Sequence, residues 1–290
     1  VYKRQLLCNF LLNFRRWQLI VRDFQVSVSF KEAVSLSWIG QFFSIVLPGS
    51  VTGDLVKAVY LSKKEKNKRG NIFFSVVLDR FCGLAALLFL GCVFYFLAFV
   101  SGISNPQLDS LGLPISLLSI ILFLSILFAK RISRVLPKID ASNKLGQIYS
   151  KIRSLVVNFS QESQWTIWRS LLLSVLSMGL NIVFFVLVAS MIHGEAAFTN
   201  LSITSYVLVM VIGFVSLSIP ITPLGLGVGQ IVFAQLFTLL GESGDAYGVP
   251  IVSFWQLSIL ALNLFGIIPY LFYKQEGRIN FEELTETSSS

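Results

Sequence analysis

Long apolar segments separated by short polar or charged loops make up most of the chain. Each is about long enough to cross ~30 Å of hydrocarbon as a helix, which takes roughly 20 residues. The pattern predicts an all-α fold, a polytopic transmembrane helical bundle within residues 1–276, and a disordered cytoplasmic tail at 277–290. The expected spans are residues 72–99, 113–129, 167–192, 201–219 and 249–273.

Two further apolar stretches, residues 33–47 and 231–240, are interrupted by helix-breaking residues. Proline removes a backbone donor and glycine allows unusual backbone angles, so a continuous helix is not expected at either place. We predict a broken hairpin at each. The breakers are Pro48, Gly49 and Gly53 directly after the first stretch, and Pro220, Pro223, Gly225 and Gly227 before the second.

Composition agrees with a membrane protein. The 290 residues are 54% hydrophobic and 13% charged, whereas a soluble domain carries about 25% charged residues. The net charge of +8 could suggest nucleic acid as a partner. Basic residues that collect in cytoplasmic loops explain it better, so no nucleic-acid binding is expected.

The loops differ sharply in charge. Lys and Arg fill residues 3–31, 57–69, 130–169 and 274–278, whereas the loops at 101–112, 194–200 and 241–248 contain none. The positive-inside rule places the first group in the cytoplasm and the second outside. The cytoplasmic and external loops can alternate along the chain in this way only if each interrupted region returns to the side from which it enters. Residues 33–57 would enter from the cytoplasm and return to it. Residues 201–240 would start outside and return there, either as two full spans or as a hairpin that stops midway.

The two interrupted regions have the same order of elements and opposite membrane sense. This predicts an inverted-topology repeat, in which paired Pro/Gly-broken segments indicate a substrate site in many transporters. Backbone freed by a break is satisfied by protein or water and not by lipid, so two re-entrant hairpins facing each other imply a polar cavity. The alternative is that Pro and Gly only kink packed helices.

Charged side chains accompany the first break. Asp54 and Lys57 share a helix face at a spacing of three residues, and Asp79 and Arg80 lie about 10 Å inside the span 72–99 at 1.5 Å per residue. We expect these four residues to bind substrate. Arg80 and Lys57 would hold an anionic group, for example a phosphate, which a guanidinium can bind through two nitrogens. The carboxylates would orient them or meet a cationic group. The alternative is a structural ion-pair cluster. In the second region only Gln230 is strongly polar, and it completes the predicted site.

Other residues suggest little chemistry. The three cysteines lie in apolar stretches without ligand spacing, and the single His193 ends a span, so no metal and no cofactor is expected. Catalytic and nucleotide-binding motifs are not found, and we expect a non-enzyme. Residues 143–164 have the spacing of an amphipathic helix on the cytoplasmic membrane face or packed on protein. Residues 6–12 resemble the end of an apolar segment, so we expect that sequence is missing before Val1.

Several motifs together are similar to the flippase-like membrane family that includes the transmembrane domain of lysylphosphatidylglycerol synthases. The similarity extends from about Arg16 to Tyr273. The motifs are "RW" at Arg16–Trp17, "LPG…GD…K" from Leu47 to Lys57, "DR" with a following glycine at Asp79, Arg80 and Gly83, and "P..P.GLGV" from Pro220 to Val228.

The resemblance implies a protein that moves lipid between leaflets, such as aminoacylated phosphatidylglycerol, while other relatives are linked to polyprenyl-phosphate sugars. The family usually has Arg at the position of Lys57. It often has Glu at the position of Gln230, and this difference argues against a proton- or amine-handling role for Gln230. The aminoacyl-transferase domain of the bifunctional synthases is not expected here.

We therefore expect a multi-pass plasma-membrane lipid flippase or transporter for an anionic-headgroup lipid of the phosphatidylglycerol type or its aminoacylated form. The expected partners are a membrane phospholipid or polyprenyl-phosphate lipid, with a homo-oligomer or a separate lipid-modifying enzyme as further candidates. Two alternatives stay open: a component of cell-envelope glycan assembly that handles polyprenyl-phosphate-linked sugars, and a non-transporting membrane scaffold.

Overall fold

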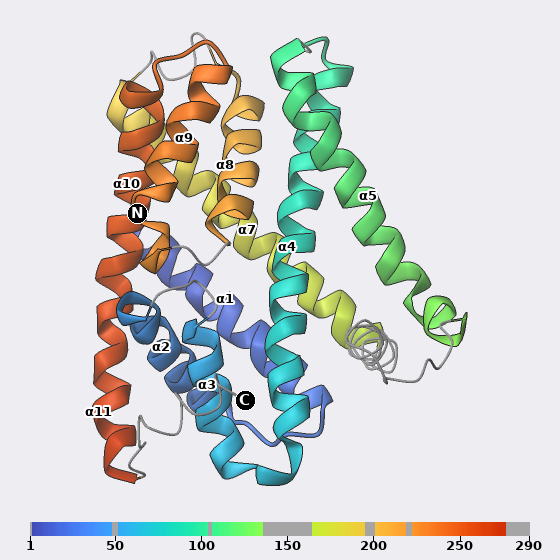
Figure 1. The fold of residues 1–290 in the computed structure, drawn as a ribbon, viewed down its shortest axis with the longest axis vertical. Helices are drawn as coiled ribbons and strands as arrows, with labels where there is room; N and C mark the ends of the chain where they lie inside the picture. Colours follow the sequence, from blue (N-terminus) through green and yellow to red (C-terminus); the bar gives the residue numbers. More distant parts are fainter. Residues whose placement is uncertain are drawn as a thin grey trace, which may run out of the picture.

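The computed structural model describes residues 2–47, 52–103, 106–135, 164–194, 201–218 and 222–276, and these residues form helices and short connections (Figure 1). The α-helices are α1 (Tyr2–Asp23), α2 (Phe30–Val46), α3 (Thr52–Lys64), α4 (Arg69–Val100), α5 (Pro106–Val135), α7 (Gln164–His193), α8 (Ile203–Leu217), α9 (Val228–Leu239), α10 (Gly244–Asn263) and α11 (Ile267–Glu276). Short 3-10 helices are η1 (Lys66–Lys68), η3 (Pro223–Gly225) and η4 (Leu264–Gly266).

The long helices confirm the prediction of an all-α membrane protein. In the described part of the chain, 4 helical segments are long and apolar enough to cross a membrane: Lys66–Val100, Pro106–Ile126, Gln164–His193 and Gly244–Phe272. The last one continues from α10 through η4 into α11. The predicted span at 201–219 is too long, because α8 has only 15 residues. At 1.5 Å per residue it extends about 22 Å, less than the ~30 Å hydrocarbon core.

Helix α1 corrects another expectation. Residues 3–31 look like a basic cytoplasmic loop, yet α1 continues as one helix from Tyr2 to Asp23. The helix persists because Arg16, near its middle, is buried and has partners inside the protein. Along its length α1 packs on α7, where Gln5 donates to the carbonyl of Leu180 and Asn9 donates to that of Ser177.

Helices α2 and α3 form an antiparallel hairpin. Ser29 caps the start of α2 by accepting a hydrogen bond from the backbone N–H of Glu32, and Lys64 at the end of α3 pairs with the same Glu32 (2.8 Å). Near the break, Gly40 and Gly53 let the backbones touch: a Cβ on Gly53 would meet the carbonyl oxygen of Gly40. Figure 1 shows this hairpin in the lower half of the molecule only.

Helices α8 and α9 form a second antiparallel hairpin, joined through η3. Tyr206 and Phe237 lie in edge contact far from the turn (5.5 Å between ring centroids), and Gly213 leaves room for the ring of Phe233 closer to it. This hairpin occupies the upper half of the molecule (Figure 1). The predicted breakers Pro48, Gly49 and Pro220 lie outside the described residues, as do most of residues 143–164 and the tail 277–290.

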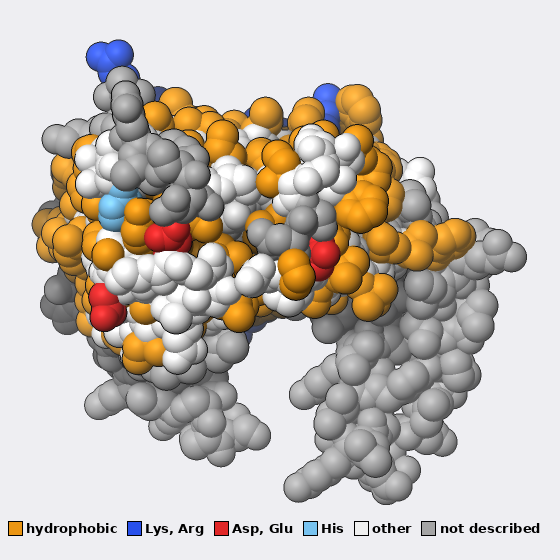
Figure 2. Space-filling model, turned by 90° about the horizontal axis from the view of Figure 1, so that it is seen from above, with side chains coloured by type: hydrophobic (Ala, Val, Ile, Leu, Met, Phe, Trp, Pro, Cys, Tyr) orange, Lys and Arg blue, Asp and Glu red, His pale blue; other side chains and the backbone are white. Residues whose placement is uncertain are grey.

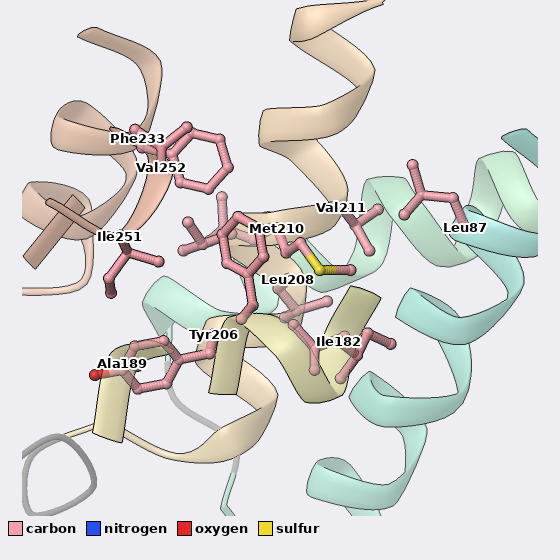
Figure 3. Packing of buried hydrophobic residues seen from close by; sticks show 14 of the residues in the cluster. Leu87, Ile182, Ala189, Tyr206, Leu208, Met210, Val211, Phe233, Ile251 and Val252 are labelled. Carbon is pink, nitrogen blue, oxygen red and sulfur yellow. The ribbon is translucent and has the colours of Figure 1, made fainter. Parts of the chain in front are cut away.

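The largest apolar core lies in the upper half, where α4, α7, α8, α9 and α10 meet. Figure 3 shows side chains from these helices packed together, among them Leu87, Ile182, Met210, Phe233 and Ile251. Helix α8 is buried on nearly all sides along residues 205–211. It is therefore surrounded by protein and not by lipid, as expected for a short helix inside a bundle.

The two ends of the molecule differ in charge. The connection at η1 is rich in lysine, whereas the connections between α9 and α10 and after α4 carry no Lys or Arg. Seen from above, the described upper end shows acidic side chains and the single histidine among apolar and neutral groups, with basic side chains only at its margin (Figure 2). This distribution agrees with a lower end that faces the cytoplasm.

Candidate functional site

Asp54, Lys57 and Arg80 meet where the first hairpin packs on α4. Asp54 lies in the first turn of α3, where the positive end of the helix dipole favours a carboxylate. One of its oxygens pairs with Lys57 one turn later (2.7 Å), and the other accepts hydrogen bonds from the guanidinium of Arg80. The carboxylate therefore holds two cations at once.

Asp79 faces another partner, Arg16 of α1. The guanidinium binds the carboxylate through two nitrogens, Nε to Oδ1 at 2.7 Å and Nη2 to Oδ2 at 3.1 Å. Its third nitrogen donates to Ser174 Oγ on α7 (2.9 Å). Adjacent residues of a helix do not point the same way, and accordingly Asp79 and Arg80 have separate partners.

Trp17 connects the two ion-pair groups. Its side chain is fully buried, its indole N–H donates to Ser75 Oγ on α4 (3.2 Å), and the ammonium of Lys57 lies 4.6 Å from its ring centre. A cation over an indole face is attracted by the ring quadrupole. Helices α1, α3 and α4 are therefore joined by polar contacts within one packed region.

The described residues of this cluster carry charges of both signs. Arg16, Lys57 and Arg80 carry three positive charges, and Asp54 and Asp79 carry two negative charges. Burial is uneven: the side chain of Arg80 is 44% exposed, whereas those of its partner Asp54 and of Lys57 are 9% and 6% exposed. The guanidinium of Arg80 is therefore the part of the cluster that can be reached from outside the protein.

A second polar cluster lies at the break before α9. The side chain of Gln230 caps this helix by accepting a hydrogen bond from the backbone N–H of Gly227 (2.8 Å), and its amide donates to Gln256 and Ser253 on α10 (2.7 and 3.1 Å). Gln256 is 1% exposed and donates to the carbonyl of Gly225 (3.0 Å). Gly225 and Gly227 have positive φ angles of 69° and 83°, which favour glycine.

The two clusters have the same layout. Asp54 and Arg80 are 26 residues apart, and so are Gln230 and Gln256. In each pair, the first residue lies in the opening turn of a hairpin's second helix and the other lies in the middle of the next helix. A glycine directly precedes the first residue of each pair: Gly53 before Asp54 and Gly229 before Gln230. Each of these glycines touches the first helix of its own hairpin.

The two breaks also approach each other. Helix α2, which ends at the first break, packs against η3 of the second break and against η4. Asn263 at the end of α10 donates to Ser44 near the end of α2, at 3.4 Å. The charged and the amide clusters therefore belong to one central region of the bundle.

The predicted site residues divide into three groups. Asp54 pairs with both Lys57 and Arg80, Asp79 pairs with Arg16, and Gln230 lies in the second cluster. Sequence reasoning missed Arg16 and Gln256 as members. Arg16 was noted only as part of a motif, while Gln256 was overlooked although a polar side chain inside an apolar span is a recognised signal of function.

Comparison with known proteins adds a family to this geometry. The family model described as "Lysylphosphatidylglycerol synthase TM region" matches residues 5–266. A UPF0104 membrane protein of Pyrococcus horikoshii is 24% identical over 275 residues, which cover 84% of this chain and 79% of the relative. No solved structure matches the chain significantly.

Proposed function

The chain belongs to the lysylphosphatidylglycerol synthase transmembrane-region family, and we propose that this multi-pass membrane protein moves an anionic-headgroup lipid between leaflets of the plasma membrane. The proposed lipid is of the phosphatidylglycerol type or its aminoacylated form. The observation that carries the proposal is the half-exposed guanidinium of Arg80, which lies inside a membrane span beside the buried Asp54 and Lys57.

A charge inside a membrane span favours this function over a purely structural role. A lone arginine at the centre of a bilayer costs about 2.5–3.5 kcal/mol on insertion scales, so such residues pair or face a wet path. A guanidinium can bind a phosphate through two nitrogens while it also contacts a carboxylate. Arg80 and Lys57 would hold the lipid phosphate, and Asp54 and Asp79 would orient these cations.

We propose further that the two hairpins are re-entrant and related by an inverted repeat. Helices α2, α3, α8 and α9 have 17, 13, 15 and 12 residues, too few for a full span at 1.5 Å per residue. The equal 26-residue spacing of the two polar pairs supports the repeat. Hairpins that enter from opposite sides and meet centrally would give a headgroup a polar route past both.

Reconstitution into vesicles tests the proposal. Purified protein is inserted into vesicles that contain fluorescent phosphatidylglycerol, lysyl-phosphatidylglycerol, phosphatidylcholine or a polyprenyl phosphate, and a membrane-impermeant quencher reports which lipid changes leaflet. We expect faster movement of the phosphatidylglycerol-type lipids than in empty vesicles. Arg80→Gln and Asp54→Asn are expected to remove most of this movement.

Lys64→Gln is the matched control. It also removes a cation paired with a carboxylate of the same hairpin, but the side chain of Lys64 is 57% exposed at the far end of α3. If no lipid moves faster than in empty vesicles, or if Arg80→Gln keeps the full rate, the proposal is wrong. Movement of polyprenyl phosphate alone would favour the glycan-assembly function.

A further inference from the structure

One face of α4 is exposed from its cytoplasmic start to Arg80 and covered beyond it. Arg69, Phe73, Val77 and Arg80 follow one another at spacings of four, four and three residues, which places them on the same helix face. All four are exposed; Phe73 is 37% and Val77 51% exposed. We call these four residues the α4 strip.

The strip ends abruptly. Leu84 continues the same face but is partly buried, and the whole following turn, residues 85–88, is buried. Further along, Ile115 of α5 and Val211 of α8 pack close to Gly91. Figure 1 shows α5 close to α4 at the top and diverging from it toward the bottom. The exposed face is therefore open toward the cytoplasmic end of the molecule and closed toward the other end.

Charge lies at both ends of the strip, and apolar side chains lie between. Arg69 stands where the span begins, and Arg80 lies 11 residues further, about 16 Å along the helix axis at 1.5 Å per residue. Leu55 of α3, next to Asp54, is 42% exposed beside the inner end. Such a surface fits a molecule with an anionic group and an apolar body.

We propose that the α4 strip is a lateral binding site for an anionic phospholipid of the cytoplasmic leaflet. The lipid phosphate binds Arg80, deeper than the neighbouring headgroups, and the lipid body lies on Phe73 and Val77. Arg69 attracts the headgroup at the membrane surface. This inference rests on the proposed function and adds the side from which the site is loaded: lipid enters from the bilayer without leaving its own leaflet.

Photo-crosslinking tests the site without a transport assay. Val77 is replaced by p-benzoylphenylalanine in the full chain, which is reconstituted in vesicles of equal phosphatidylglycerol and phosphatidylcholine. Lipids attached after illumination are counted by mass spectrometry. We expect phosphatidylglycerol to exceed phosphatidylcholine by about tenfold, because both lipids carry a phosphate but only phosphatidylcholine brings a quaternary ammonium, which the cations of the strip repel. Arg80→Gln should return the ratio to that of the bulk lipid.

The matched control is the same replacement at Phe96, which is 62% exposed on the other half of α4. There the bulk ratio is expected. In vesicles whose phosphatidylglycerol is confined to one leaflet, Val77 should capture it at once only from the cytoplasmic-side leaflet. A bulk ratio at Val77, enrichment that survives Arg80→Gln, or equal early capture from both leaflets would overturn the proposal.

These outcomes separate the two proposals. Enrichment at Val77 without any lipid movement supports the lateral site and contradicts the flippase function. Lipid movement that depends on Arg80, together with a bulk ratio at Val77, supports the flippase function and contradicts the lateral site.

Discussion

At two places in the bundle, a helix that begins after a break is attached to the middle of the following helix. At the lower place Asp54 joins Lys57 and Arg80 by ion pairs, and at the upper place Gln230 joins Gln256 and Ser253 by amide hydrogen bonds. The sequence spacing within the two main pairs is identical, at 26 residues. The clusters thus differ in charge far more than in layout.

Charge is therefore not needed to attach the helix that follows a break to the next helix. The amide pair caps α9 and holds the loop before it through neutral contacts alone. Ion pairs are a costly way to do the same, because burying charges incurs a desolvation penalty that mutual attraction does not always offset. The layout alone therefore does not account for the charges of the first cluster, and the proposed anionic ligand supplies a reason for them.

The largest effect is expected at the pair of Arg16 and Asp79, because both side chains are almost completely buried. Asp79→Asn leaves Arg16 buried without its counter-charge, which costs about 3–5 kcal/mol. We expect a strong fall in thermal stability, measured by tryptophan fluorescence in detergent. The double variant Arg16→Met with Asp79→Leu should recover much of it. Unchanged stability of Asp79→Asn would show that this pair contributes little.

A smaller effect distinguishes the two helix–helix contacts. At Gly53 a Cβ would meet the backbone oxygen of Gly40, which cannot move aside, whereas at Gly229 it would meet the side-chain nitrogen of Gln256. Overpacking costs about 1–3 kcal/mol. We therefore expect Gly53→Ala to lower the melting temperature more than Gly229→Ala. The reverse order would mean that the amide cluster is the more rigid of the two.

The sequence predicts these regions unevenly, for physical reasons. Pro, Gly and apolar length locate the breaks, and a spacing of three residues brings Asp54 and Lys57 together within one helix. The pairing of Arg16 with Asp79 spans 63 residues and depends on how α1 packs on α4 and α7, which no local pattern contains. The burial of Arg16 against Asp79 also explains why the arginine-rich residues of α1 form a helix and not a loop.

The most direct test of the comparison converts the charged cluster into the amide one. The triple variant Asp54→Asn with Lys57→Gln and Arg80→Gln keeps hydrogen-bonding groups at all three positions while it removes all three charges, so that the buried Lys57 is not left without its counter-charge. Because the upper cluster holds with amides, we expect the melting temperature to change little. Lipid movement should fall about tenfold or more, the effect of losing one charge-assisted hydrogen bond to a phosphate.

A large loss of stability in this triple variant would mean that the ion pairs serve the fold, and the contrast between the clusters would lose its functional meaning. Full lipid movement with normal stability would exclude a role for these charges in substrate binding. Each result is measured on the same preparation, by tryptophan fluorescence and by the quencher assay, so folding and transport are separated.

The smallest effect is expected at the ion pair that lies farthest from the break. Lys64 and Glu32 join the ends of the first hairpin at 2.8 Å, but Lys64 is 57% exposed. Exposed pairs contribute about 0–1 kcal/mol because water and salt screen them. Lys64→Gln should therefore leave the melting temperature and the rate of lipid movement nearly unchanged. A rate reduced as much as in Arg80→Gln would show that an exposed cation far from the break matters equally and that the position of Arg80 inside the span has no special role.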